Sequence, residues 1–134
     1  MRVTPKKIES LEPDDVFVFG SNLKGIHGAG AAKEALKWGA EWGKSCGHYG
    51  QTYAIPTKNV KLKTLFLTTI EPFVIEFIEY AKENPDLRFL VTPIGCGMAG
   101  YLPSAIAPLF KDAIDVKNIY LPQSFWRVLN PNEK

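Results

Sequence analysis

Two glycine-rich segments have the residue types that bind anions. The first is GSNLKGIHGAGAA, residues 20–32, and the second is PIGCGMAGY, residues 93–101. Each follows a short apolar run and precedes a segment in which a helix is expected. A loop between a buried strand and a helix directs backbone N–H groups outward, and glycine lets a phosphate approach them closely. Two such loops at one edge of a sheet could hold neighbouring phosphates, so the sequence predicts a diphosphate site.

The spacing of the glycines excludes the common nucleotide-binding motifs. Glycines at 25, 28 and 30 match neither G-x-x-x-x-G-K-[ST] nor G-x-G-x-x-G, so P-loop and Rossmann assignments do not fit. The alternative interpretation of either loop alone is that its glycines only serve turns with positive φ.

Three polar side chains near these loops are candidates for binding or chemistry. Asn22 could contact the hydroxyls of a ribose, or it could form a turn. His27 could meet a phosphate or a sugar, or it could hold the loop by hydrogen bonds. Lys58 follows an apolar run and could neutralise phosphate or assist catalysis, or it could be a solvated lysine.

The cysteines and histidines do not predict a metal site. Cys46 and His48, with His27 and Cys96, could supply four ligands, but the Cys-x-His spacing matches none of the usual zinc patterns. Cys96 has no histidine beside it in sequence, which argues against a catalytic thiolate. Two distant cysteines in a chain without an export signal favour reduced thiols and a cytoplasmic location.

The apolar patterns predict the elements that position the two loops. Strands are expected at 16–19, 52–56, 88–92 and 118–122, the first and third of them buried, with Pro56 ending the second. Helical spacing predicts helices over about 28–39 and around 73–81, with Asn84-Pro85 as a stop. Because Pro108 is costly inside a helix, a short turn is expected at 103–107 and a helix from about 108. Residues 39–51 read as a loop, and residues 59–69 as a turn-rich or strand-like piece.

Alternating strands and helices predict a three-layer α/β/α fold with a central mixed, largely parallel sheet. A chain of 134 residues suffices for one core, so residues 1–134 are expected to form a single domain. No apolar run approaches the roughly 18 residues of a membrane span, which predicts a soluble protein. The net charge is +2 with scattered lysines, which makes nucleic acid an unlikely partner.

Three blocks together resemble the macro domain, the ADP-ribose-binding α/β/α fold, and in particular a little-characterised group of macro-domain-like proteins of bacteria and phages. The blocks are VFVFGSNLKGIHGAGAAKEA, GHYGQTYAIPTKN and FLVTPIGCGMAGYLPSAIAPLF. The resemblance implies that Asn22 lies beside the distal ribose, and that the two loops enclose the diphosphate. The ligand-binding residues implied in this way are Gly20, Ser21, Asn22, His27, Gly28, Ala29, Gly30, Ala31, Gly95, Cys96, Gly97, Met98, Ala99, Gly100 and Tyr101.

The second loop is similar to that of the macro-domain branch that removes ADP-ribose from glutamate or acetyl groups. That branch has a lysine near the position of Lys58 and an acid in the second loop, where this chain has Ala99. Asn22 and Lys58 are therefore the candidate catalytic residues. Asp14 and Asp15 lie in the region of the family's adenine-recognising aspartate, but the local pattern leaves adenine recognition open.

Three functions are consistent with these patterns. The leading hypothesis is binding of ADP-ribose or a related nucleotide diphosphate ribose, without a cofactor. The second is hydrolysis that releases ADP-ribose from a side chain, an acetyl group or a phosphate. The third is an α/β interaction module whose loops are only turns and whose partner binds the carboxyl-terminal aromatics. Phe125 and Trp126 in that segment could stack on a base or pack in the core.

Overall fold

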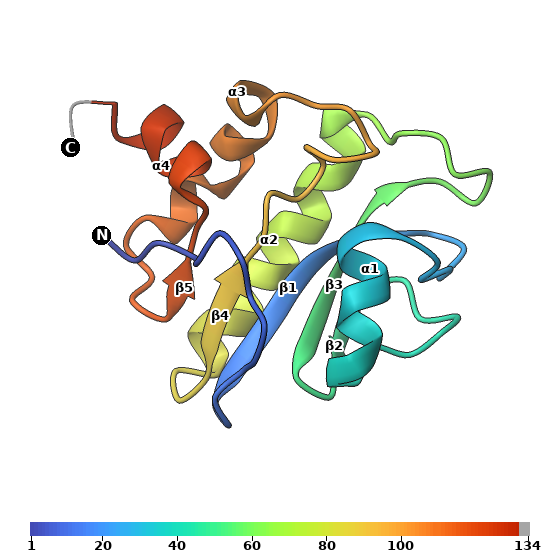
Figure 1. The fold of residues 1–134 in the computed structure, drawn as a ribbon. Coiled ribbons are helices and arrows are strands. Elements are labelled where there is room, and N and C mark those ends of the chain that lie inside the picture. The colour runs from blue at the N-terminus through green and yellow to red at the C-terminus, as the bar shows by residue number, and fades with distance from the viewer. Residues whose placement is uncertain (132–134) are drawn as a thin grey trace.

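A five-stranded sheet forms the centre of the computed structural model, which describes residues 1–131 (Figure 1). Its strand order is β2-β3-β1-β4-β5, with β2 antiparallel to β3 and the other neighbouring pairs parallel. The elements in chain order are β1 (Asp15–Asn22), α1 (Gly30–Ala35), η1 (Leu36–Trp38), β2 (Gly47–Tyr49), β3 (Thr52–Lys58), α2 (Leu67–Glu83), β4 (Arg88–Val91), α3 (Pro103–Ile106), η2 (Ala107–Ala113), β5 (Ile119–Tyr120) and α4 (Gln123–Leu129).

Helices cover both faces of the sheet, so the α/β/α prediction is confirmed. Val16 and Val18 of β1 face a large core shared with α2, η2 and α4. Phe17 and Phe19 face a smaller core formed with α1. Because β1 is apolar on both faces, it can occupy the middle of the sheet, as its sequence predicts.

The region between β1 and α2 departs most from prediction. The helix after the first loop is α-helical only to Ala35, continues as a 3₁₀ turn, and ends at Gly39 with φ +108°. Residues 47–49, expected in a loop, form the edge strand β2. Pro56 does not end β3, which continues to Lys58. On one side of β3, the edge strand β2 pairs only as far as Ala54, so Pro56 lies beyond the end of β2. A missing N–H is tolerated there, and β1 still pairs with β3 on the other side.

The carboxyl-terminal third also differs in detail. Pro108 lies in η2, a 3₁₀ segment that follows directly on α3, and not at the start of an α-helix. Residues 123–129, which the sequence pattern assigns to no helix or strand, form α4. Phe125 and Trp126 are fully buried there, which favours packing over stacking on a base. No helix within residues 1–131 is long and apolar enough to cross a membrane.

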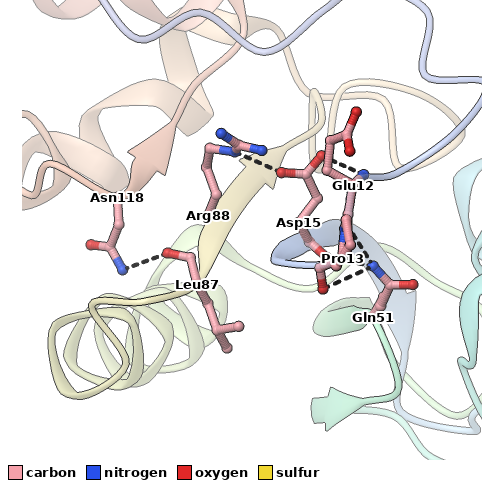
Figure 2. A network of polar contacts seen from close by, with 7 residues as sticks. All are labelled: Glu12, Pro13, Asp15, Gln51, Leu87, Arg88 and Asn118. Atoms are coloured by element: carbon pink, nitrogen blue, oxygen red, sulfur yellow. Dashed lines mark hydrogen bonds and ion pairs between the residues drawn. The ribbon is translucent and has the colours of Figure 1, made fainter.

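A polar network fastens the amino ends of the strands, at the edge of the sheet away from the glycine loops (Figure 2). Arg88 Nε donates to Asp15 Oδ1 at 2.7 Å, and the Glu12 N–H donates to Asp15 Oδ2 at 2.9 Å. The hydrogen bond and charge of Asp15 raise the pKa of the Arg88 guanidinium. Gln51 Nε2 donates to the carbonyl oxygens of Glu12 and Asp15. Asp15 therefore has a structural role at the start of β1, seven residues from Asn22 at its other end.

Candidate functional site

A cavity of about 450 Å³ lies where the loops after β1 and β4 meet, at the carboxyl ends of these central strands. Its size falls in the range of roughly 300–1,000 Å³ that is typical of small-molecule sites. It brings together these predicted site residues: Gly20, Ser21, Asn22, Gly28, Ala29, Gly30, Ala31, Lys58, Gly95, Gly97, Met98 and Ala99. The remaining lining residues, which sequence reasoning did not select, are Ile26, Ala32, Thr57, Leu62, Thr92, Pro93 and Ile94.

The two glycine loops face each other across this cavity. A Cβ atom placed on Gly30 would lie 3.6 Å from Met98 Cε, so the loops approach to van der Waals distance at this point. Thr92 Oγ1 donates to the Val18 carbonyl oxygen at 2.7 Å and ties the start of the second loop to β1. The prediction that both loops border one site agrees with this geometry.

Some glycines in the two loops are required by the fold. Gly25 has φ +74°, and a Cβ atom there would lie 2.4 Å from the backbone of Gly43. Gly95 has φ +76°, and its Cβ atom would lie 2.8 Å from Ile106 Cδ1. At both positions the backbone conformation and the packing demand glycine whether or not a ligand binds.

Gly28 and Gly97 differ, because nothing in the folded chain requires glycine there. Neither residue has a positive φ. A Cβ atom on Gly28 would make only an ordinary contact at 3.7 Å with Ile26, and one on Gly97 would meet nothing within 4 Å. Both residues line the cavity and both are exposed. The space that these two glycines leave open therefore belongs to the cavity and is accessible from solvent.

Asn22 uses its amide group to shape the first loop. Its Nδ2 donates to the Ile26 carbonyl oxygen at 2.9 Å, and its Oδ1 accepts from the Ile26 N–H at 3.1 Å. Ser21 is buried beside it and its hydroxyl donates to the Ser45 carbonyl oxygen. Asn22 still lines the cavity, with one N–H of its amide outside these bonds. It therefore forms the turn that sequence reasoning weighed against ribose binding, while its position leaves that contact geometrically open.

Lys58 gives the cavity its positive charge. It is half-buried at the end of β3, and its carbonyl oxygen accepts from the Leu23 N–H at 2.8 Å. Among the described residues that line the cavity there is no Asp, Glu, His or Cys. The segments that supply most of this lining, 16–33, 42–70 and 87–111, contain no acidic residue at all. This gap in the acidic residues is a sequence signal that could have located the site.

His27 lies beneath the first loop and does not line the cavity. It is 1% exposed, and its Nδ1 donates to the Gly25 carbonyl oxygen at 2.8 Å. Its ring packs against Phe19 and Trp42. Its Nε2 has no hydrogen-bond partner among the described residues. The geometry matches the alternative in which this histidine holds the loop.

Three predicted residues of the second loop do not line the cavity. Cys96 packs partly buried against the main core, and burial raises the pKa of its thiol. Gly100 has φ +85°, and its N–H donates to the Gly97 carbonyl oxygen at 3.0 Å. Tyr101 donates its hydroxyl to the Leu65 carbonyl oxygen at 2.7 Å. These residues support the loop, and a raised thiol pKa is the opposite of what a cysteine nucleophile needs.

A second cavity, of about 1000 Å³, adjoins the first and shares Ala31, Thr92 and Pro93 with it. The amino-terminal segment, α1 and α4 form its walls. Its charged lining residues are Lys6, Lys7, Glu9, Glu34, Lys37 and Arg127.

Within residues 1–131, no group of three or more His, Cys, Asp or Glu side chains is placed to hold a metal ion. Both cysteines are free thiols. Comparisons of the chain with protein-family models, with curated proteins and with solved structures found no match.

Proposed function

We propose that this protein binds ADP-ribose, or a closely related nucleotide diphosphate ribose, in the cavity between the two glycine loops. The diphosphate lies against the backbone of the loops near Gly28 and Gly97, and the ribose beyond it lies toward Asn22 and Lys58. The free thiols of Cys46 and Cys96 fit a reducing cytoplasm as the site of action.

One observation carries the proposal: glycine occupies two exposed cavity-lining positions, Gly28 and Gly97, where neither φ nor packing within the chain requires it. Glycine in an ordinary conformation is conformationally costly, since it loses more freedom on folding than any other residue. A ligand whose oxygens must reach the backbone supplies the missing reason. Phosphate fits this role because its oxygens accept from backbone N–H groups.

The charge around the cavity favours an anion over a neutral ligand. Lys58 is the sole ionisable side chain among the described residues of its lining. A carboxylate close to a diphosphate would repel it, and none lines this cavity in the described part of the chain. The adjoining cavity of about 1000 Å³ offers room for the nucleoside end of the same ligand.

Hydrolysis of an ADP-ribosyl bond is a second candidate, and the position of Lys58 favours it. This lysine lines the end of the cavity where the distal ribose is proposed to lie, so its charge could stabilise a developing oxyanion. The described lining offers no carboxylate or histidine as a general base, so activation of water would fall to Lys58 or to the substrate. Binding without turnover is therefore the function that the geometry supports best.

Calorimetric titration with ADP-ribose, beside AMP, ADP and NAD, tests the proposal. Gly28→Val and Gly97→Val each place a branched side chain over the diphosphate position and should lower the affinity for ADP-ribose by at least about a hundredfold. Ser104→Val adds similar bulk on an exposed position of α3 and should leave binding unchanged. Unchanged affinity in folded Gly28→Val and Gly97→Val variants would show that no phosphate lies there.

A further inference from the structure

The amino-terminal segment forms one wall of the larger cavity, the one of about 1000 Å³. Its first residues are fixed beside the last strand and helix. The Thr4 N–H donates to the Leu121 carbonyl oxygen at 2.9 Å, and Trp126 Nε1 donates to the Arg2 carbonyl oxygen at 2.7 Å. From there the segment crosses the same face of the sheet as α1 (Figure 1), and Ile8 packs against the smaller core. The wall of this cavity is therefore anchored next to β5 and α4.

This cavity is larger than the nucleoside end of the proposed ligand requires. Its volume is about 1000 Å³, whereas the first cavity, which is proposed to hold a diphosphate and a whole ribose, has about 450 Å³. A base with one ribose is of similar size to a diphosphate with one ribose. Apolar side chains, among them Ile8, Pro93 and Pro122, can enclose the base. Space therefore remains for one more group on the nucleoside.

The charge of the lining favours an anion as that group. The described lining contains four basic and two acidic side chains, and the two acidic ones form ion pairs with two of the basic ones at 3.1 and 2.7 Å. The other two basic side chains are Lys6 and Arg127. Neither forms an ion pair with a carboxylate in the part of the chain that the structure describes. The lining therefore has two excess positive charges, which reside on Lys6 and Arg127.

Both of these cations come from segments beside β5, at the edge of the sheet. Lys6 is two residues beyond Thr4, which is bonded to the end of β5, and Arg127 is in α4, the helix that follows β5. The residues that this cavity shares with the first one belong instead to α1 and to the loop after β4. A ligand whose diphosphate lies in the first cavity would therefore meet Lys6 and Arg127 at its nucleoside end.

Thr4 adds a polar group without a partner. This residue lines the larger cavity and is 5% exposed, and its Oγ1 has no hydrogen-bond partner among the described residues. A buried hydroxyl that lacks a partner destabilises the fold, so such groups are rare in native structures. An oxygen of a ligand, bonded directly or through a water molecule, can supply the partner close to Lys6.

We infer that the larger cavity accepts a nucleoside whose ribose carries a phosphate, and that Lys6 and Arg127 bind this phosphate. The inference rests on the proposed function and names its ligand class, an ADP-ribose with a further phosphate on the ribose of its adenosine. Charge-assisted hydrogen bonds to phosphate are strong, and an arginine near the ribose is a known means of accepting a 2′-phosphate in dinucleotide sites. Phosphates on the 2′ and 3′ oxygens share this chemistry, and the test separates them.

Calorimetric titration compares ADP-ribose with its 2′-phosphate and its 3′-phosphate. One of the two phosphorylated forms should bind at least about tenfold more tightly than ADP-ribose, because two cations then contact the added phosphate. The double variant Lys6→Gln/Arg127→Gln should lose this gain. The matched control Lys111→Gln/Lys117→Gln removes two exposed charges from residues that line neither cavity, so it should keep the gain. The affinity for ADP-ribose itself should change no more in the double variant than in the control.

Equal affinities for ADP-ribose and both phosphorylated forms overturn the inference, and so does a gain that the double variant keeps. A gain that the control also loses reflects net charge alone and overturns it as well. If ADP-ribose binds in none of its forms, the proposed function fails, and adenosine 2′,5′-bisphosphate, adenosine 3′,5′-bisphosphate and AMP then test the larger cavity alone. A bisphosphate that binds more tightly than AMP, with an advantage lost in the double variant, still supports the inference. Equal binding of all three overturns it.

Discussion

Replacing Gly25 and Gly28 separately by alanine should separate a glycine that the fold needs from one that it does not. Gly25→Ala forces a Cβ atom to within 2.4 Å of the Gly43 backbone at φ +74°. The left-handed conformation costs about 1–2 kcal/mol and the overlap about 1–3 kcal/mol. The lower entropy of the unfolded chain offsets about 0.4–1 kcal/mol. The variant should therefore lose about 1–5 kcal/mol of unfolding free energy.

Gly28→Ala should have the opposite effect on stability. Its Cβ atom meets Ile26 at 3.7 Å, an ordinary contact, and φ is not positive. The one effect that remains is the lower conformational entropy of the unfolded chain. The free energy of unfolding should therefore be unchanged or increased by up to about 1 kcal/mol. For a domain of this size each kcal/mol shifts the melting temperature by about 3–5 °C, so the two variants should melt at least about 3 °C apart.

Thermal unfolding followed by circular dichroism measures this difference, and calorimetry with ADP-ribose on the same samples measures binding. Gly28→Ala should retain the fold and lose affinity, since the methyl group occupies the approach to the backbone. If Gly28→Ala melts as low as Gly25→Ala, the fold itself requires glycine at 28. A ligand would then not be the reason for glycine at this position, whatever the calorimetry gives.

Three further predictions follow from the site and from its supports. Lys58→Met should lower the affinity for ADP-ribose about tenfold with little change in stability, and equal salt dependence of binding in both proteins would contradict a role for its charge. Asp15→Asn should cost about 1–3 kcal/mol of unfolding free energy, because it weakens the bonds to half-exposed Arg88 and to the Glu12 N–H, without changing binding measured well below the melting temperature. Burial raises the pKa of both thiols, at Cys46 and at Cys96, and at Cys46 the charge of Glu76 adds to it. Alkylation by iodoacetamide should therefore reach its half-maximal rate at a higher pH in the folded protein than in guanidinium, and coincident curves would contradict this. The same shift stabilises the fold below the pKa of the unfolded thiol, and this contribution is lost as the pH rises through the folded value.

The central strands could be predicted because their pattern has one cause. Val16, Phe17, Val18 and Phe19 are apolar on both faces, and a strand with this pattern has to be covered on both sides. The short edge strand β2 was missed since it pairs along one side only, over Gly47–Tyr49, and its residues are half-buried. The end of β3 was also predicted wrongly, at Pro56. Whether the missing N–H of a proline ends a strand depends on the length of the neighbouring strand, here β2, and not on the local sequence.

That the two glycine loops border one cavity could be predicted, but the contacts of each residue in them could not. That the loops after the two central strands meet follows from parallel topology, and residue type located both. Which glycine adopts a positive φ depends on contacts with distant segments, such as Gly43 against Gly25 and Ile106 against Gly95. No feature of the sequence near Gly28 or Gly97 distinguishes these glycines from the others. Only the tertiary structure separates a glycine required by a turn from one left free for a ligand.

The polar side chains around the cavity mostly bind the loops themselves. Asn22 hydrogen-bonds to the backbone of the first loop, and Asn59 to the backbone of the turn that follows β3. The hydroxyls of Thr64 and Tyr101 connect that segment to the second loop. These side chains could bind ribose or phosphate by their type, but in the structure they form hydrogen bonds to the backbone. Residue type alone therefore does not reveal what they bind. What remains for a ligand is the backbone at Gly28 and Gly97 and the charge of Lys58. If an anion binds here as proposed, the shape and the backbone of the loops hold it, and the cavity offers little for acid–base catalysis because its side chains are committed to keeping that shape.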